Sequence, residues 1–318
     1  MPEHKLLNLL SKLGLNTAAE DCAINEINPD QYLVTNIDIV TPIHDDPEIM
    51  GKIAACNVTN DIFAMNATSI LNFSCFLGIP FDIPAEIAEG LLRGVRNFVK
   101  DLGADIHGGH TIQNPWPLIG GTASAILDKD QIIRKHGLKP SDRLFITKPL
   151  GIQAIMAAYR VLNKNPELLA HLDNNKINKT IKIAEKSMTT SNQPIPLAIQ
   201  EYKLVSWIHA MTDITGFGLK GHLGEMLQQS GLGADLSKIP VFPTAPELDQ
   251  EFNYGILDGC GAEIAGGMLI AVDNAKAKDL SESLTKHKVW HLEIGQISSQ
   301  FEGLRFGKDF RYTEIEDY

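Results

Sequence analysis

Four aspartates stand out because they occur next to strand ends or glycine turns, in segments that are otherwise typical of a buried core. They are Asp21 in "EDCAI", Asp38 in "TNIDIV", Asp61 in "TNDIF" and Asp213 in "MTDITGFG". An unpaired carboxylate is costly to bury, so each of these side chains needs a cation, hydrogen-bond donors or water. Any one of them could instead cap a helix or a turn. The four together favour Mg²⁺, a hard ion that takes oxygen ligands and keeps phosphate oxygens in its shell.

Two glycine-containing stretches are candidates for binding phosphate, since glycines let backbone N–H groups approach an anion closely. They are "HGGHT" (107–111) and "TGFG" (215–218). Neither has the GxxxxGK[ST] form of a P-loop or a GxGxxG after a strand, and each taken alone is explained by a tight turn. The histidines show no zinc spacing with a cysteine, so we interpret them as structural. The chain has no GxSxG motif, which disfavours a nucleophile-based hydrolase.

Length and composition predict a folded protein of about two domains. The chain has 318 residues, of which 44% are hydrophobic and 21% charged. Its formal net charge is −11 and it has no run of lysines or arginines, so we expect no nucleic-acid partner. Four cysteines without a CxxC pair indicate a reducing, cytoplasmic setting. We expect neither export nor a membrane span, because Met1 precedes a short amphipathic segment and no stretch reaches 18 uncharged apolar residues.

The order of predicted elements favours an α+β protein with two sheets. In the first half we expect a helix at 4–13, strands at 32–40 and 69–79, and a helix opening with Pro84 and closing at Gly103. "DIHGGHTI" reads as a strand running into a glycine turn, and residues 119–133 as a strand pair. The second half restarts with a helix at 152–162 and continues with strand, glycine loop and helix over 210–231. We therefore expect domains at 1–148 and 149–318.

A set of motifs resembles the selenophosphate synthetases (selenide, water dikinases), which belong to the AIR-synthetase-like superfamily of the purine cyclo-ligase. The motifs are "EDCAI", "TNIDIVTPIHDDPEIMGKIAACNVTNDIFAMNA", "GGHTI", "LFITKPLG", "MTDITGFGLKGHLGEM" and "GGMLIAV". They span about residues 19 to 300, and "MTDITGFGLKGHL" separates this family from related enzymes. The resemblance implies two α/β domains and a homodimer whose N-terminal sheets pair. It also implies that ATP binds near the dimer interface and that Mg²⁺ supports conversion of ATP, selenide and water into selenophosphate, AMP and phosphate.

The resemblance also implies which residues would act. The family's metal-binding aspartates fall on Asp21, Asp38, Asp61 and Asp213, and Asp38 and Asp61 also belong to the ATP site. The family's phosphate-contacting residues fall on Gly108, Gly109, His110 and Thr111. These positions make residues 1–148 the ATP-binding, metal-binding and dimerisation domain, with 149–318 as a C-terminal α/β domain.

Three departures from the family pattern bear on function. "IAGG" (264–267) stands where the family has "TSGG", and Asn60 stands where a serine is usual. The family also carries a glycine-rich loop ahead of the first helix, with a reactive Cys or selenocysteine and a catalytic lysine three residues later. Those two residues would precede Met1, so the catalytic residues are unknown.

The missing loop leads to one expectation and two alternatives. We expect a chain whose start was assigned just after a selenocysteine codon, and which binds ATP and Mg²⁺ but makes little selenophosphate. The first alternative is an ATP-using paralogue with another acceptor. The second is a non-catalytic nucleotide-binding subunit.

Overall fold

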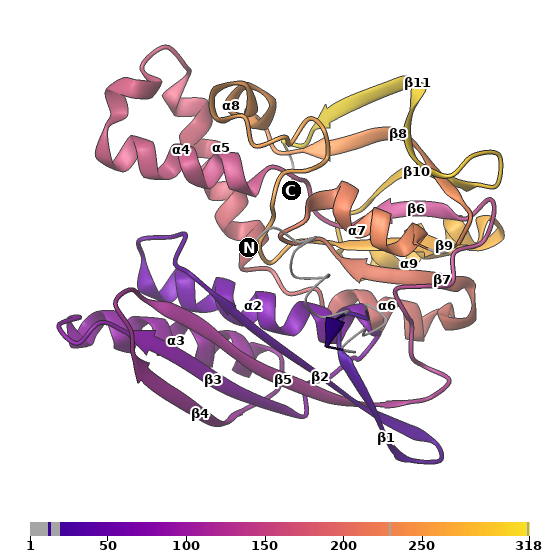
Figure 1. Cartoon of the computed structure of the whole chain (residues 1–318), viewed down its shortest axis with the longest axis horizontal. Coiled ribbons are helices and arrows are strands. Elements are labelled where there is room, and N and C mark those ends of the chain that lie inside the picture. The colour runs from indigo at the N-terminus through magenta and orange to yellow at the C-terminus, as the bar shows by residue number, and fades with distance from the viewer. Residues whose placement is uncertain (1–11, 14–19, 229, 317) are drawn as a thin grey trace.

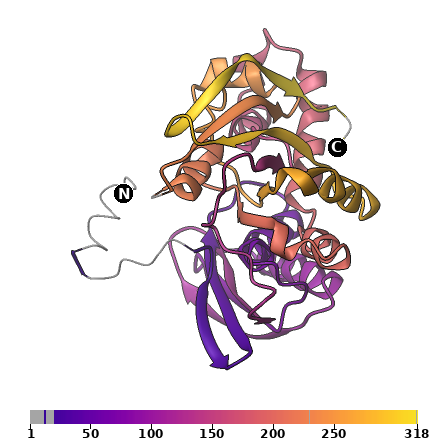
Figure 2. The ribbon, with the colours of Figure 1, turned by 90° about the vertical axis from the view of Figure 1, so that its right-hand side faces the viewer.

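The structure is a computed structural model that describes residues 12–13, 20–228, 230–316 and 318. Most of the helix expected at 4–13 lies outside the described residues. Two sheets, each with its own helices, confirm the predicted mixed α/β architecture. In Figure 2 the N-terminal sheet lies in the lower lobe and the C-terminal sheet in the upper one. None of the described helices is long and apolar enough to cross a membrane.

The N-terminal sheet has five strands in the order β1-β2-β5-β3-β4. Their bounds are β1 Ala23–Asn28, β2 Gln31–Val40, β3 Asn72–Ile79, β4 Ile106–Gln113 and β5 Leu118–Asp128. All pairs are antiparallel except β3 with β4. Within 119–133 only one strand forms, because Gln131 closes a turn on Asp128 instead of starting a second strand.

Helices α2 (Pro47–Ala64) and α3 (Ala85–Asp101) pack on one face of this sheet (Figure 1). Helix α2 begins after Asp46, whose side chain accepts the backbone N–H groups of Glu48 and Ile49. The two helices approach closely at Gly51 and Gly94, where an added Cβ would lie 2.1 Å from a backbone oxygen of the other helix. This contact holds α2 firmly over the sheet.

The opposite face of the N-terminal sheet has no cover from the described residues. Ile37 and Ile39 alternate with Asp38, which faces α2, so the two isoleucines point away from the helices. Their side chains are 65% and 42% exposed, and Ile126 on β5 and Ile112 on β4 are also exposed. We call this surface, with Ile37, Ile39, Ile112 and Ile126, the outer face.

The glycine turn predicted in "DIHGGHTI" is wrong. Gly108 and Gly109 lie inside β4, which pairs in parallel with β3 and forms the edge of the sheet. Gly109 is required by close approach within the sheet, since a Cβ there would lie 2.4 Å from the carbonyl oxygen of Cys75. A glycine pair between β-forming residues fits a turn and a tightly packed strand equally well, and the local sequence could not separate them.

The C-terminal sheet has six strands in the order β11-β8-β10-β6-β9-β7. Their bounds are β6 Arg143–Ile146, β7 Ile208–Asp213, β8 Gly233–Val241, β9 Met268–Val272, β10 Leu292–Ser298 and β11 Gly303–Glu314. Its helices are α4 Ile152–Lys164, α5 Asn174–Met188, α6 Pro194–Glu201, α7 Gly218–Leu227, α8 Ala245–Phe252 and α9 Ala277–Lys286. Strand β6 pairs in this sheet although it precedes residue 149.

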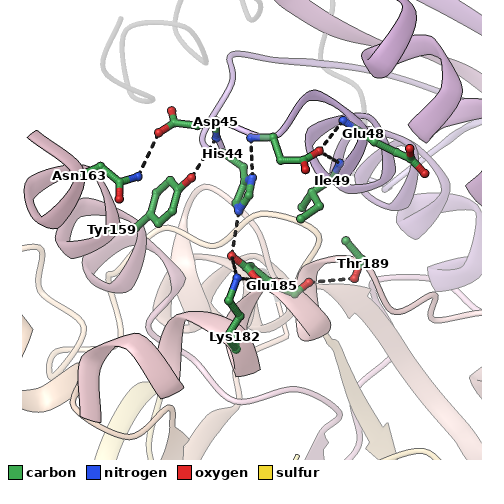
Figure 3. A network of polar contacts seen from close by, with 10 residues as sticks. His44, Asp45, Glu48, Ile49, Tyr159, Asn163, Lys182, Glu185 and Thr189 are labelled. Carbon is green, nitrogen blue, oxygen red and sulfur yellow. Dashed lines mark hydrogen bonds and ion pairs between the residues drawn. The ribbon is translucent and has the colours of Figure 1, made fainter. Parts of the chain in front are cut away.

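A polar network joins the loop between β2 and α2 to the C-terminal helices (Figure 3). The His44 ring stacks on the ring of Tyr159 in α4, with centroids 4.9 Å apart. Its Nε2 lies 2.9 Å from a Glu185 carboxylate oxygen in α5, and its Nδ1 accepts the backbone N–H of Asp46. Lys182 also donates to Glu185. The start of α2 is therefore fixed against helices α4 and α5.

Candidate metal and nucleotide site

Three of the four aspartates singled out in the sequence meet where the two lobes join. Asp21 lies just before β1, Asp61 near the end of α2, and Asp213 at the end of β7. One carboxylate oxygen from each lies within 4.8 Å of the other two. Since two of these residues come from the N-terminal part and one from the C-terminal sheet, the cluster exists only when both lobes are in place.

Asp38 joins the cluster from β2. Its carboxylate accepts hydrogen bonds of 3.1 Å from the side-chain amides of Asn36 and Asn57. Its charge is close enough to Asp61 to raise the pKa of that residue. The position of Asp38 beside Asp61 is fixed by the two asparagine contacts.

The carboxylates raise one another's pKa values in this buried setting. Burial, followed by the charges of Asp213 and Asp38, holds the pKa of Asp61 well above its usual range. Burial also raises the pKa of Asp213, although His222 and Lys135 oppose the rise. Carboxylate oxygens of Asp21, Asp61 and Asp213 lie within 4.8 Å of one another, so these groups titrate as a coupled set. The cluster thus favours any arrangement that brings positive charge to it.

Lys135 supplies some of that charge. Its Nζ lies 2.6 Å from Oδ1 of Asp21 and 3.0 Å from a carboxylate oxygen of Glu225. Burial raises the pKa of Asp21 to about 7 even though the Lys135 ammonium lowers it. The single positive charge of Lys135 therefore does not neutralise the four acidic groups.

The residues present fit a divalent cation. Oδ2 of Asp21 is buried and has no hydrogen-bond partner among the described residues, whereas Oδ1 is occupied by Lys135 and by the Thr212 hydroxyl. A buried, unpartnered carboxylate oxygen is costly unless something binds it. The donor atoms of the cluster are all carboxylate oxygens, which suit Mg²⁺ and exclude a soft-metal site.

Comparisons with known proteins identify the family. The sequence profile of the N-terminal domain of AIR synthase related proteins matches residues 19–127, and that of the C-terminal domain matches 139–304. A selenide, water dikinase from Methanocaldococcus jannaschii is 38% identical over 97% of this chain and 89% of its own length. One from Methanococcus maripaludis is 38% identical over 92% and 87%, and one from Dictyostelium discoideum 30% identical over 94% and 85%. The chain belongs to the selenide, water dikinase family.

Solved structures show the same fold at low identity. Thiamine-monophosphate kinase from Aquifex aeolicus superimposes with a TM-score of 0.72 and 15% identity, covering 99% of this chain and 100% of its own. The hydrogenase maturation protein HypE in complex with ATP gives 0.69 and 17%, covering 96% and 92%. These likenesses support the AIR-synthase-like fold of this selenide, water dikinase family member.

The second set of predicted site residues lies apart from the carboxylates within one chain. Gly109 pairs with Cys75, Cys75 with Gly121, and Gly121 with Asp38. Three inter-strand spacings separate Gly109 from Asp38, which is about 14 Å. Gly108, Gly109, His110 and Thr111 are all exposed on the edge strand. Together with Arg96 of α3 they line an open pocket of about 310 Å³.

The "TGFG" stretch, in contrast, lies directly after Asp213. It connects β7 to α7, and Nε2 of His222 accepts the backbone N–H of Thr215 at 3.1 Å. His222 therefore holds the loop that follows a candidate metal ligand, in keeping with its interpretation as a structural histidine.

Sequence reasoning missed the neutral and basic residues around the carboxylates. Asn57, Asn60 and Lys135 all contact the cluster, yet none was a candidate. The one available signal was the spacing of Asn57, Asn60 and Asp61 on one helix, three and four residues apart, which puts them on one face. Cys22, also beside the cluster, is no nucleophile, because burial and the surrounding aspartates raise its thiol pKa far above neutrality.

Proposed function

We propose that this protein makes selenophosphate from ATP, selenide and water, releasing AMP and phosphate. The observation that supports it most strongly is the meeting of Asp21, Asp61 and Asp213 at a buried junction of the two lobes, in a chain of the selenide, water dikinase family. A net charge of −11 disfavours binding of a triphosphate unless cations neutralise it. A site that holds divalent cations resolves this difficulty.

In this proposal Asp21, Asp38, Asp61 and Asp213 hold Mg²⁺. Bound there, Mg²⁺ neutralises the triphosphate and the charge that develops at the transferred phosphorus. The chain's own residues keep the ligands in place: Asn36 and Asn57 donate to Asp38, while Thr212 and Lys135 hold one oxygen of Asp21. Asp38 and Asp61 would be the ligands of the ion that neutralises the nucleotide phosphates.

The proposal includes a homodimer. Gly108, Gly109, His110 and Thr111 are about 14 Å from Asp38 in one chain, which is too far for both sets to contact the same phosphate group. A second copy seated on the outer face would bury Ile37 and its neighbours, which are exposed in one chain.

Sedimentation tests the dimer. An Ile37→Lys variant places a charge at the centre of the outer face and should sediment as a monomer, whereas Leu168→Lys, at an equally exposed position on the C-terminal lobe, should remain a dimer. A wild-type monomer at micromolar concentration would contradict the dimer.

We also propose a cytoplasmic location without nucleic-acid partners. All four cysteines are free in the structure, in keeping with a reducing compartment. The net charge of −11 makes a polyanion an unfavourable partner.

Product analysis tests the reaction. The full gene product is incubated with ATP and Mg²⁺, with and without selenide, and products are resolved by ³¹P NMR. We expect selenide-dependent AMP and selenophosphate, a loss of at least about 100-fold in Asp61→Asn because a ligand is removed, and no change in Asp82→Asn, an exposed control. ADP as the sole nucleotide product, formed at the same rate without selenide, would exclude the proposed reaction.

A further inference from the structure

Asn60 is completely buried in α2, immediately before Asp61. Its Oδ1 accepts a hydrogen bond of 2.9 Å from the side-chain amide of Asn192. Its Nδ2 donates to the backbone oxygen of Gly266 at 3.0 Å. Both partners belong to the C-terminal lobe, so this one amide crosses the junction between the lobes.

The partners of Asn60 are themselves tightly linked. Gly266 packs so closely that an added Cβ would lie 1.8 Å from the backbone oxygen of Ile214, the residue after Asp213. Ile214 in turn donates its backbone N–H to Gly267 at 2.9 Å. The 264–267 segment, which reads "IAGG", therefore lies against the end of the strand that carries Asp213.

Asn57, one helical turn before Asn60, binds the same segment by a hydrogen bond. Its Oδ1 accepts the backbone N–H of Ala265 at 2.8 Å, while its Nδ2 donates to Asp38. Ala265 has a φ of +49°, in the left-handed region, and its carbonyl accepts from Lys148 at 2.8 Å. An alanine in that conformation is held there by its surroundings. Two asparagines of α2 thus hold the 264–267 segment, and Asn57 also connects it to the Asp38 carboxylate.

We propose that Asn60 is a positioning residue for Asp213 and acts through Gly266, which packs against Ile214, the residue after Asp213. A primary amide offers two donors and an acceptor on one planar group, enough to serve Gly266 and Asn192 at once. A serine at this position offers one donor on a shorter side chain. With Asn60 in place, the 264–267 segment is fixed through its backbone and needs no hydroxyl of its own.

The inference deepens the proposed metal site and rests on it. A partner that orients a metal ligand typically contributes 10–100-fold to metal affinity. Because Asn60 is neutral, its loss changes no charge near the ion, and the loss of an oriented ligand should lower the affinity.

The test measures the Kd for Mn²⁺ by calorimetric titration of the nucleotide-free full chain. The stability of each variant is measured separately by unfolding in EDTA. Asn60→Ser should raise the Kd for Mn²⁺ about 10–100-fold. The control is Thr59→Val, at the next position of the same buried helix, where the hydroxyl bonds only to carbonyls of its own helix. Thr59→Val should lower stability without changing the Kd more than about twofold, well inside the range for an orienting partner.

The outcomes separate the two proposals. If the wild type binds Mn²⁺ and Asn60→Ser binds it equally well, Asn60 does not position Asp213 and only this inference is overturned. If the wild type binds no divalent cation, the metal site is wrong and the inference falls with it. If Asn60→Ser does not fold, Asn192→Ala removes a partner of Asn60 without touching a carboxylate. An unchanged Kd in Asn192→Ala would then overturn the proposal.

Discussion

Replacing Asp61 by asparagine should stabilise the metal-free protein and abolish its response to Mg²⁺. Asp61 lies within 4.8 Å of Asp21 and Asp213 through its carboxylate oxygens. Two ionised carboxylates at that distance repel each other by about 3.5 kcal/mol at an effective dielectric constant of 20. An asparagine of the same size removes this repulsion, and its side-chain N–H groups can donate to a neighbouring carboxylate.

Proton uptake limits the gain. A tenfold change in proton affinity corresponds to about 1.4 kcal/mol, and because the pKa of Asp61 is raised, proton uptake relieves part of the repulsion in the wild type. We therefore expect a net gain of about 2–4 kcal/mol at pH 8 in EDTA. The pKa of Asp61 is raised in the folded protein, so unfolding releases a proton above about pH 4. Wild-type stability consequently falls as the pH rises from about 4, and the Asp61→Asn variant should lack this part of the decline.

Magnesium should remove most of the difference in stability between the two proteins. At a concentration 100 times its Kd, a bound ion stabilises the wild type by about 2.7 kcal/mol, whereas the variant has lost a ligand and gains little. The assay is denaturant unfolding of both proteins at pH 5 and pH 8, in EDTA and in Mg²⁺, with Asp82→Asn as the exposed control. An Asp61→Asn protein that is less stable than wild type in EDTA at pH 8, and gains as much from Mg²⁺, would refute the reasoning.

Three further substitutions test the framework around the site. Gly94→Ala should lower the free energy of unfolding by about 3 kcal/mol, since its Cβ would lie 2.1 Å from a backbone oxygen of α2; Gly224→Ala, with open space around it, should raise it by about 0.5–1 kcal/mol. Glu185→Gln weakens the contact to His44 and should cost about 1–3 kcal/mol at pH 7. Burial raises the pKa of Glu185, but hydrogen bonds from Lys182 and His44 hold the pKa below its usual value. The stabilisation from Glu185 should therefore be lost as the pH falls below about 4, and the stabilities of wild type and Glu185→Gln should then converge. Lys148→Met should cost about 2–4 kcal/mol in urea unfolding, because the three backbone carbonyls bound by its buried ammonium lose their donor.

The carboxylates and the two-sheet architecture could be predicted because their signals are local. Asp38 and Asp213 each interrupt or end a strongly β-forming run, and a charge in such a run needs an explanation wherever the strand lies. The strands β8 and β11 were not predicted. In β11 the apolar residues Leu304, Phe306, Phe310 and Tyr312 stand at alternate positions, but Lys308 interrupts the pattern and every residue is exposed or half-buried, so the strand signal is weak.

The contacts that complete the site could not be predicted, because they join residues far apart in the chain. Lys135 follows the first sheet and reaches Asp21 and Glu225, which are 114 residues before and 90 residues after it. Nothing near Lys135 marks it as different from a surface lysine. Only the docking of the two lobes makes it a buried cation.

Helix α2 nevertheless carries a signal of that docking. Its buried residues include Asn57, Thr59 and Asn60 as well as apolar ones from Met50 to Ala64, so it has no solvated polar face. A helix buried on nearly all sides lies inside the protein, and here α2 contacts β2 and β5 of the first sheet and β7 of the second. Polar groups inside such a helix must be paired, and the partners must come from whatever covers it. The asparagines of α2 therefore mark the surface where the second lobe docks. Asp61, which follows them, lies where carboxylates from both lobes meet.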